Sequence, residues 1–207
     1  MGLHFSKRTH TTLAKSNEAP AGRVRIIGGA WKKSVLRFPA MADLRPTPDR
    51  VRETLFNWLG QDLSGQACLD LFAGSGALGF EAASRGAGRV VLVERDREAV
   101  RAMQANAERL SGKALQVVAG DASMFLKTAN ERFDVVFLDP PFRQNVLPEV
   151  LACLPGVLKA GSRVYVESPE AVEAQGGWRE LKRSRAGQVS YQLLEWSDDR
   201  SGLSGDV

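Results

Sequence analysis

The tetrapeptide Asp139-Pro140-Pro141-Phe142 places a carboxylate, two rigid residues and an aromatic ring directly after an apolar run. The Asp139 carboxylate and the Pro140 carbonyl are two acceptors, and the proline rings fix the backbone that carries them. Two fixed acceptors suit the exocyclic amine of a planar base, because holding both N–H groups frees the nitrogen lone pair for attack. Phe142 could stack on the base, a contact worth about 1–3 kcal/mol. The motif is therefore suited to chemistry on a base amine.

A second candidate site is the segment Gly74–Gly79, which reads GSGALG and fits the pattern G-x-G-x-x-G. It follows an expected strand and precedes an expected helix, where glycines let the backbone approach a ligand closely. We expect Gly74, Ser75 and Gly76 to contact a nucleotide cofactor. Glu94 ends the next expected strand, close to the offset of about 20 residues that is typical of a ribose-binding acid.

The loop fits either NAD or S-adenosylmethionine, since both carry an adenosine ribose. Asp70 lies four residues before Gly74, where its charge could face a cationic amino-acid group that NAD lacks. Asp121 ends the third expected strand, where it could accept from the adenine amine while Ala122 offers its backbone N–H. Asp121 is also a good N-cap, and the two roles are compatible. An NAD oxidoreductase stays an alternative, although no core histidine or Tyr-x-x-x-Lys pair supports hydride transfer.

The cysteines, the spacing of possible metal ligands and the apolar runs limit the reactions and partners to be expected. The two cysteines, Cys68 and Cys153, lie in apolar segments, which favours buried, reduced thiols and a cytoplasmic protein. No Cys/His cluster has zinc spacing, so we expect no metal. No apolar run approaches the roughly 20 residues of a membrane helix, so we expect no membrane partner. Methyl transfer by one in-line displacement requires neither a metal nor a covalent nucleophile, and it depends mostly on positioning.

These side chains must be positioned by alternating strands and helices. Strand-like runs cover Ala67–Ala73, Arg89–Glu94, Leu115–Asp121, Phe133–Asp139 and Arg163–Glu167. Helical runs between them cover Ala77–Ser84, Arg97–Leu110, Ala122–Ala129 and Val146–Leu154. Regular alternation predicts a parallel, doubly wound α/β sheet, and Trp178–Ser184 with Gln188–Trp196 predict an antiparallel hairpin at its edge. Ligands bind at the carboxyl ends of such strands, so the DPPF motif should lie beside the glycine loop.

The N-terminal part of the chain is strongly basic. Residues 1–60 hold 11 Lys or Arg against four acidic residues, whereas the remainder holds 17 against 20. This asymmetry is typical of a polyanion-binding extension, although a solvated surface without a partner is an alternative. We expect a disordered tail over 1–22, a basic hairpin and helix over 23–60, a catalytic domain over 61–196 and a second tail over 197–207. Thr47 is the expected N-cap of the helix, with Pro48 in its first position.

Six segments in order carry a family resemblance: RIIGGAW (25–31), LRPTPDRVRETLFNWL (44–59), CLDLFAGSGALGFEAASRGA (68–87), VFLDPPFR (136–143), YVES (165–168) and GQVSYQLLEW (187–196). Together they resemble the bacterial 16S ribosomal RNA guanine-N2 methyltransferases of the RsmD type. The resemblance spans roughly residues 23–196. The glycine loop and DPPF are shared with many methyltransferases, whereas RPTPDRVRETLFNWL is specific to this family.

The resemblance implies a Rossmann-like class I methyltransferase with a mostly parallel seven-stranded sheet. It implies methyl transfer from S-adenosylmethionine to N2 of one guanine in 16S rRNA, within the small ribosomal subunit, by a protein that we expect to be monomeric. The family's cofactor roles fall on Asp70, Gly74, Ser75, Gly76, Glu94 and Asp121, and its catalytic motif on Asp139, Pro140, Pro141 and Phe142. Expected phosphate contacts are Arg23, Arg25, Lys32, Lys33, Arg37, Arg45, Arg50, Arg52 and Arg143. A DNA adenine-N6 methyltransferase and a non-catalytic, cofactor-binding ribosome-assembly factor are alternatives.

Overall fold

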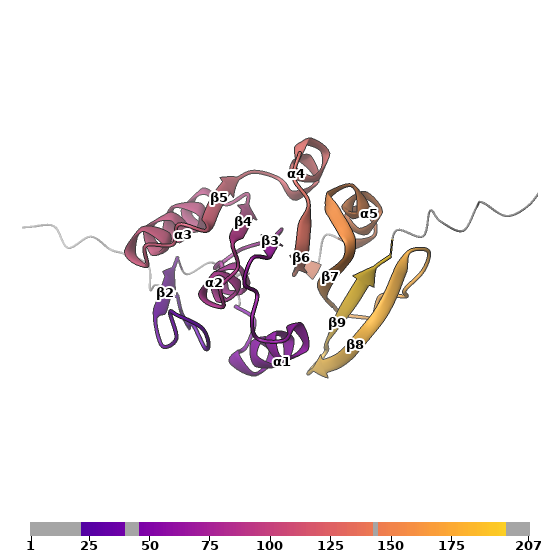
Figure 1. The fold of residues 1–207 in the computed structure, drawn as a ribbon, viewed down its shortest axis with the longest axis horizontal. Coiled ribbons are helices and arrows are strands. Elements are labelled where there is room, and N and C mark those ends of the chain that lie inside the picture. The colour runs from indigo at the N-terminus through magenta and orange to yellow at the C-terminus, as the bar shows by residue number, and fades with distance from the viewer. Residues whose placement is uncertain (1–21, 40–45, 143–144, 198–207) are drawn as a thin grey trace, which may run out of the picture.

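A seven-stranded sheet forms the centre of the chain, in the order β5-β4-β3-β6-β7-β9-β8 (Figure 1). Its strands are β3 (Ala67–Asp70), β4 (Arg89–Glu94), β5 (Leu115–Ala119), β6 (Phe133–Leu138), β7 (Leu158–Ser168), β8 (Trp178–Ala186) and β9 (Val189–Trp196). Strands β3 to β7 pair in parallel with one another, and β9 is antiparallel to both β7 and β8. The predicted α/β fold with a C-terminal antiparallel hairpin is therefore confirmed, and the hairpin adds two strands at the edge.

The computed structural model describes residues 22–39, 46–142 and 145–197. The predicted phosphate contacts Arg45 and Arg143 lie outside the described residues, as do almost all of the two predicted tails. Within the described part, no helix is both long and apolar enough to cross a membrane. The described residues also contain no cluster of three His, Cys, Asp or Glu side chains able to hold a metal ion.

Helices cover both faces of the sheet, so the central strands β3, β4 and β6 are mostly buried, whereas the edge strands β5 and β8 are not. The helices are α1 (Asp49–Leu59), α2 (Ala77–Ser84), α3 (Arg97–Arg109), α4 (Ala122–Thr128) and α5 (Leu147–Cys153). One apolar cluster joins α1, α2 and α3 to one face of the sheet, and a second joins α4, α5 and the short 3-10 helix Leu154–Val157 to the other. Figure 1 shows α4 and α1 on opposite sides of the strands.

The N-terminal segment packs as part of the first cluster. Its strands β1 (Gly22–Arg25) and β2 (Val35–Phe38) form an antiparallel hairpin. Ile26 and Leu36 are buried there together with Leu55 and Phe56 of α1. The Glu81 carboxylate of α2 accepts from the backbone N–H groups of Ile27 and Gly28 at 2.9 and 2.7 Å. A buried glutamate of α2 thus helps to fix the basic hairpin to the helices that cover the sheet.

Two local predictions are wrong. Helix α1 begins at Asp49 after Pro48, with no side-chain N-cap, and the Thr47 hydroxyl instead donates to Asp139. Thr47 therefore serves a contact distant in sequence rather than the helix start. Cys153 is only partly buried, whereas Cys68 is fully buried and burial raises its pKa to about 12.

Candidate active site

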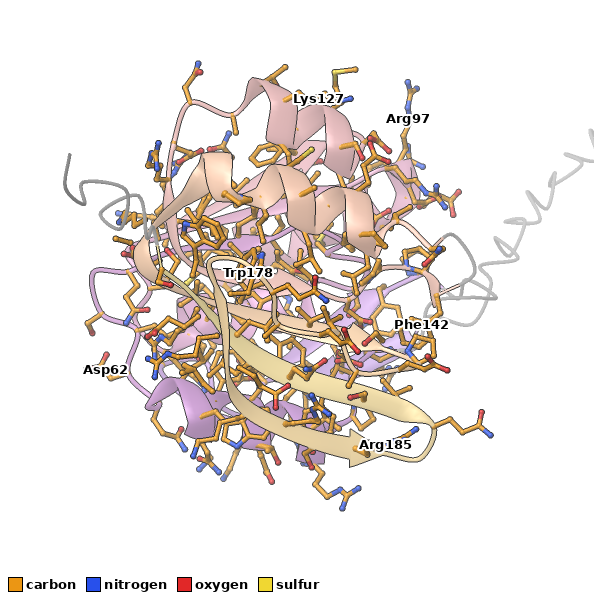
Figure 2. All side chains as sticks on the ribbon, turned by 90° about the vertical axis from the view of Figure 1, so that its right-hand side faces the viewer. Asp62, Arg97, Lys127, Phe142, Trp178 and Arg185 are labelled. Atoms are coloured by element: carbon orange, nitrogen blue, oxygen red, sulfur yellow. The ribbon has the colours of Figure 1, made fainter. Side chains whose placement is uncertain are left out.

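Four acidic side chains lie along the carboxyl edge of the parallel strands. Asp70 ends β3, Glu94 ends β4, Asp139 follows β6 and Glu167 lies near the end of β7. Asp70 is level with Phe137 in the β3–β6 pairing, which brings the glycine loop beside the DPPF motif, as predicted. In Figure 2, Phe142 and Arg97 lie on one side of the molecule and Asp62, before β3, lies on the other.

The glycine loop adopts backbone angles that favour glycine. Gly74 and Gly76 have φ of 51° and 77°, in the left-handed region. A Cβ on Gly79 would stand 2.8 Å from a methyl group of Leu92, so α2 packs closely on β4 there. The Gly74 N–H donates to the Glu94 carboxylate at 2.9 Å. The loop is thus tied to the same acid that was predicted to bind a ribose.

Asp70 lies beneath this loop, almost fully buried. Its carboxylate accepts from the Gly79 N–H at 2.9 Å and forms no salt bridge with any residue in the described ranges. Burial raises the pKa of Asp70 to about 7, with a smaller contribution from the charge of Glu94. A buried carboxylate without a cation fits the predicted role of facing an ammonium group.

Asp121 performs the N-cap role that the sequence allowed. One of its carboxylate oxygens accepts from the backbone N–H groups of Ser123 and Met124 at 2.9 and 3.1 Å. Ala122 opens α4 and is buried. The adenine contacts of Asp121 and Ala122, and the cofactor contact of Ser75, stay predictions.

In the DPPF motif, the acceptors are sheltered and the ring is exposed. Asp139 is partly buried, Pro140 is buried, and Phe142 is 43% exposed. The Thr47 hydroxyl lies 3.4 Å from Asp139 Oδ2. Burial, followed by the charges of Glu167 and Asp70, raises the pKa of Asp139 well above its ordinary value, and the Thr47 hydrogen bond opposes this rise. The ring of Phe142 is accessible, and its stacking on a base stays a prediction.

Sequence reasoning missed Glu167 and its partner Tyr165. Glu167 is 7% exposed, and the Tyr165 hydroxyl donates to its Oε1 at 2.8 Å. Burial raises the pKa of Glu167, and hydrogen bonds from Tyr165 and Thr47 oppose this rise. The segment YVES (165–168) could have indicated Glu167. Ligands bind at the carboxyl ends of strands, and this rule applies to β7 as well as to β6.

Most of the predicted phosphate contacts in the described ranges are exposed. They are Arg23, Arg25, Lys32, Lys33, Arg37 and Arg50. A surface pocket is lined by Arg23, Arg25 and Thr47, among others. Thr47, one of the residues that line this pocket, also contacts Asp139 of the DPPF motif.

The prediction that Arg52 contacts a phosphate is wrong, because its side chain is only 1% exposed. Its guanidinium donates to Asp49 at 2.6 Å and to Glu81 at 3.2 Å, and also to the backbone carbonyls of Arg25 and Thr47. Arg52 therefore joins α1, α2 and the hairpin from inside. The sequence did not indicate this role, because Arg52 lies in a basic segment and its partner Glu81 is distant in sequence.

A family model and a protein of known sequence match most of this chain. The family model described as conserved hypothetical protein 95 matches residues 24–195. The chain is 41% identical over 192 residues to ribosomal RNA small subunit methyltransferase D of Escherichia coli, covering 88% of this chain and 95% of that protein.

Solved structures agree with the sequence matches. The structure of yhhF from Escherichia coli superposes with a TM-score of 0.77 at 40% identity, covering 85% of this chain and 99% of that one. The SMU.776 protein, complexed with SAH, has a TM-score of 0.67 at 14% identity, covering 90% of this chain and 58% of that one. The second likeness shows a shared fold alone.

Proposed function

The chain belongs to the RsmD family of ribosomal RNA small subunit methyltransferases, and from this membership we propose that it methylates the exocyclic N2 amine of one guanine in 16S rRNA, with S-adenosylmethionine as donor. The observation that carries the proposal is the contact between Thr47 and Asp139. Thr47 lies in the segment specific to this family, and Asp139 lies in the motif suited to a base amine. We propose the cytoplasm as the location and the small subunit as the partner.

The residues at the glycine loop fit the donor. S-adenosylmethionine supplies an electrophilic methyl group on a sulfonium, and it also carries an ammonium group and a ribose. Asp70 offers a buried carboxylate without a cation. Glu94 holds the loop and has further lone pairs for ribose hydroxyls. The positive φ angles of Gly74 and Gly76 leave the loop backbone open to close approach.

The chemistry of the acceptor follows from the DPPF motif. Asp139 and the Pro140 carbonyl accept from the two N2 hydrogens, and Phe142 stacks on the base after it has left its own stack. The N2 lone pair forms the new N–C bond while the C–S bond breaks. The nitrogen then carries an extra proton, and Asp139 is a suitable acceptor because its pKa is raised.

A labelled-cofactor assay tests the proposal. Purified protein is incubated with small ribosomal subunits, 16S rRNA or duplex DNA, and modified nucleotides are identified by mass spectrometry. The proposal expects N2-methylguanine in 16S rRNA at one position. Label in DNA alone would favour the adenine-N6 alternative, and absence of label in every substrate would favour a non-catalytic assembly factor.

Cofactor binding should depend on pH through Asp70. Its pKa of about 7 means that it is mostly protonated at pH 6, and a cationic ligand favours the ionised form. We therefore expect the Kd for S-adenosylmethionine to rise up to about 10-fold per pH unit below that pKa. Titration calorimetry from pH 5.5 to 7.5 measures this, and Asp70→Asn should remove the dependence. Asp62→Asn, on the opposite side of the molecule, is the control; a flat profile for the wild type would contradict the assignment.

The pair Arg23 and Arg37 should contribute to RNA binding without supporting the fold. They lie directly opposite each other in the β1–β2 pairing, and both are exposed. Like charges in this position destabilise a hairpin. Arg23→Ala/Arg37→Ala should therefore bind 16S rRNA more weakly, with a salt slope reduced by about 2, and melt no lower than the wild type. Filter binding across salt concentrations measures the slope, with exposed Lys127→Ala on α4 as control; an unchanged slope would exclude these phosphate contacts.

A further inference from the structure

Asp139 and Glu167 stand side by side at the end of two adjacent strands. Leu138 pairs with Val166 in the parallel β6–β7 ladder, so the residues that follow each of them are level. Adjacent strands lie about 4.8 Å apart. Two carboxylates at that spacing can line a single edge of one base.

The two carboxylates have few donors of their own. The Tyr165 hydroxyl donates to Glu167, and the Thr47 hydroxyl, which has one hydrogen, faces both acids. Neither acid forms a salt bridge within the described residues, and the nearby Arg52 is engaged by Asp49 and Glu81. A buried ionised carboxylate is costly without donors, so this part of the site requires them from its ligand.

The edge of guanine supplies donors in this arrangement. Its N1–H and the two hydrogens of its N2 amine form a continuous row of donors. Adenine has an acceptor nitrogen beside its amine, which would face a carboxylate with no hydrogen between them. A site built to bond a particular hydrogen rejects analogues that lack it, because its own buried groups are then unpaired.

We propose that Glu167 is a specificity-determining residue that accepts the N1–H of the target guanine, while Asp139 and Pro140 hold its N2 amine. The inference rests on the proposed function and assigns the recognition of guanine, rather than of any base amine, to one side chain. Burial raises the pKa of both acids, which agrees with a pair that lacks donors until a base enters.

The test compares guanine with 2-aminopurine at the target position of reconstituted small subunits. 2-Aminopurine keeps the N2 amine but has an acceptor at N1. The wild type should prefer guanine by about 100-fold or more in kcat/KM. Glu167→Gln should lower kcat/KM on guanine by about 10- to 100-fold. The same variant should lose most of the preference, because the glutamine amide can donate to N1 of 2-aminopurine.

Two results would overturn the inference. One is equal wild-type rates on guanine and 2-aminopurine, a measurement that needs no variant to fold. The other is a Glu167→Gln enzyme that is slowed equally on both substrates, since this is the behaviour of a merely structural residue. Glu108→Gln, exposed on α3, should leave both rates unchanged. Failure of the wild type to methylate guanine at all would instead refute the proposed function.

Discussion

The Asp139→Ala variant is expected to lose methyl transfer by about 10²–10³-fold in kcat, the cost typical of removing one preorganised hydrogen-bonding group from an active site. Without the carboxylate, only the Pro140 carbonyl holds the amine, and the nitrogen lone pair stays delocalised. Cofactor binding should persist, because the glycine loop and Asp70 are unchanged. Single-turnover rates with small subunits, together with titration calorimetry, separate these two effects.

The same variant should be at least as stable as the wild type at pH 8. The pKa of Asp139 is raised in the folded protein, so ionising this group costs stability progressively as pH rises from its unfolded pKa toward its folded one. Asp139→Asn keeps an acceptor oxygen and should retain more activity than Asp139→Ala. A wild-type rate for Asp139→Ala would exclude Asp139 from catalysis and favour another role for the motif.

The parts of the site that the sequence predicted well are those that depend on local pattern. The apolar runs before Asp70, Glu94 and Asp139 placed these acids at strand ends, because a parallel strand buried on both faces is apolar throughout. Their meeting at one edge then followed from the crevice rule. The fold and the position of DPPF beside the glycine loop were confirmed for this reason.

The parts that sequence reasoning missed depend on contacts between distant segments. Thr47 matches the pattern of a helix N-cap, yet its hydroxyl is turned to Asp139, which lies 92 residues away. Arg52 belongs to a basic segment, yet it is buried against Glu81, which lies 29 residues away. Neither partner can be identified from residue type or spacing, because only the packed arrangement of α1, α2 and β6 brings them together.

The largest effect on stability is expected for Glu81→Gln. Glu81 is fully buried and receives Arg52, Arg85 and the backbone N–H groups of Ile27 and Gly28. The substitution keeps the shape of the side chain but leaves the buried Arg52 guanidinium without its buried counter-charge. Removing one partner of such a pair costs about 3–5 kcal/mol, and urea denaturation measures this loss in the free energy of unfolding.

A second glutamate–arginine pair provides the matched control. Glu131 and Arg89 are bonded at the surface, with 34% and 45% of their side chains exposed, so Glu131→Gln should cost only about 0–1 kcal/mol. Equal costs for the two variants would mean that the Glu81 network contributes no more than a surface pair. If the network anchors the hairpin, Glu81→Gln should also weaken RNA binding more than cofactor binding. That result would connect a buried ion pair to substrate recognition, because the hairpin carries the basic surface and leads to Thr47 beside Asp139.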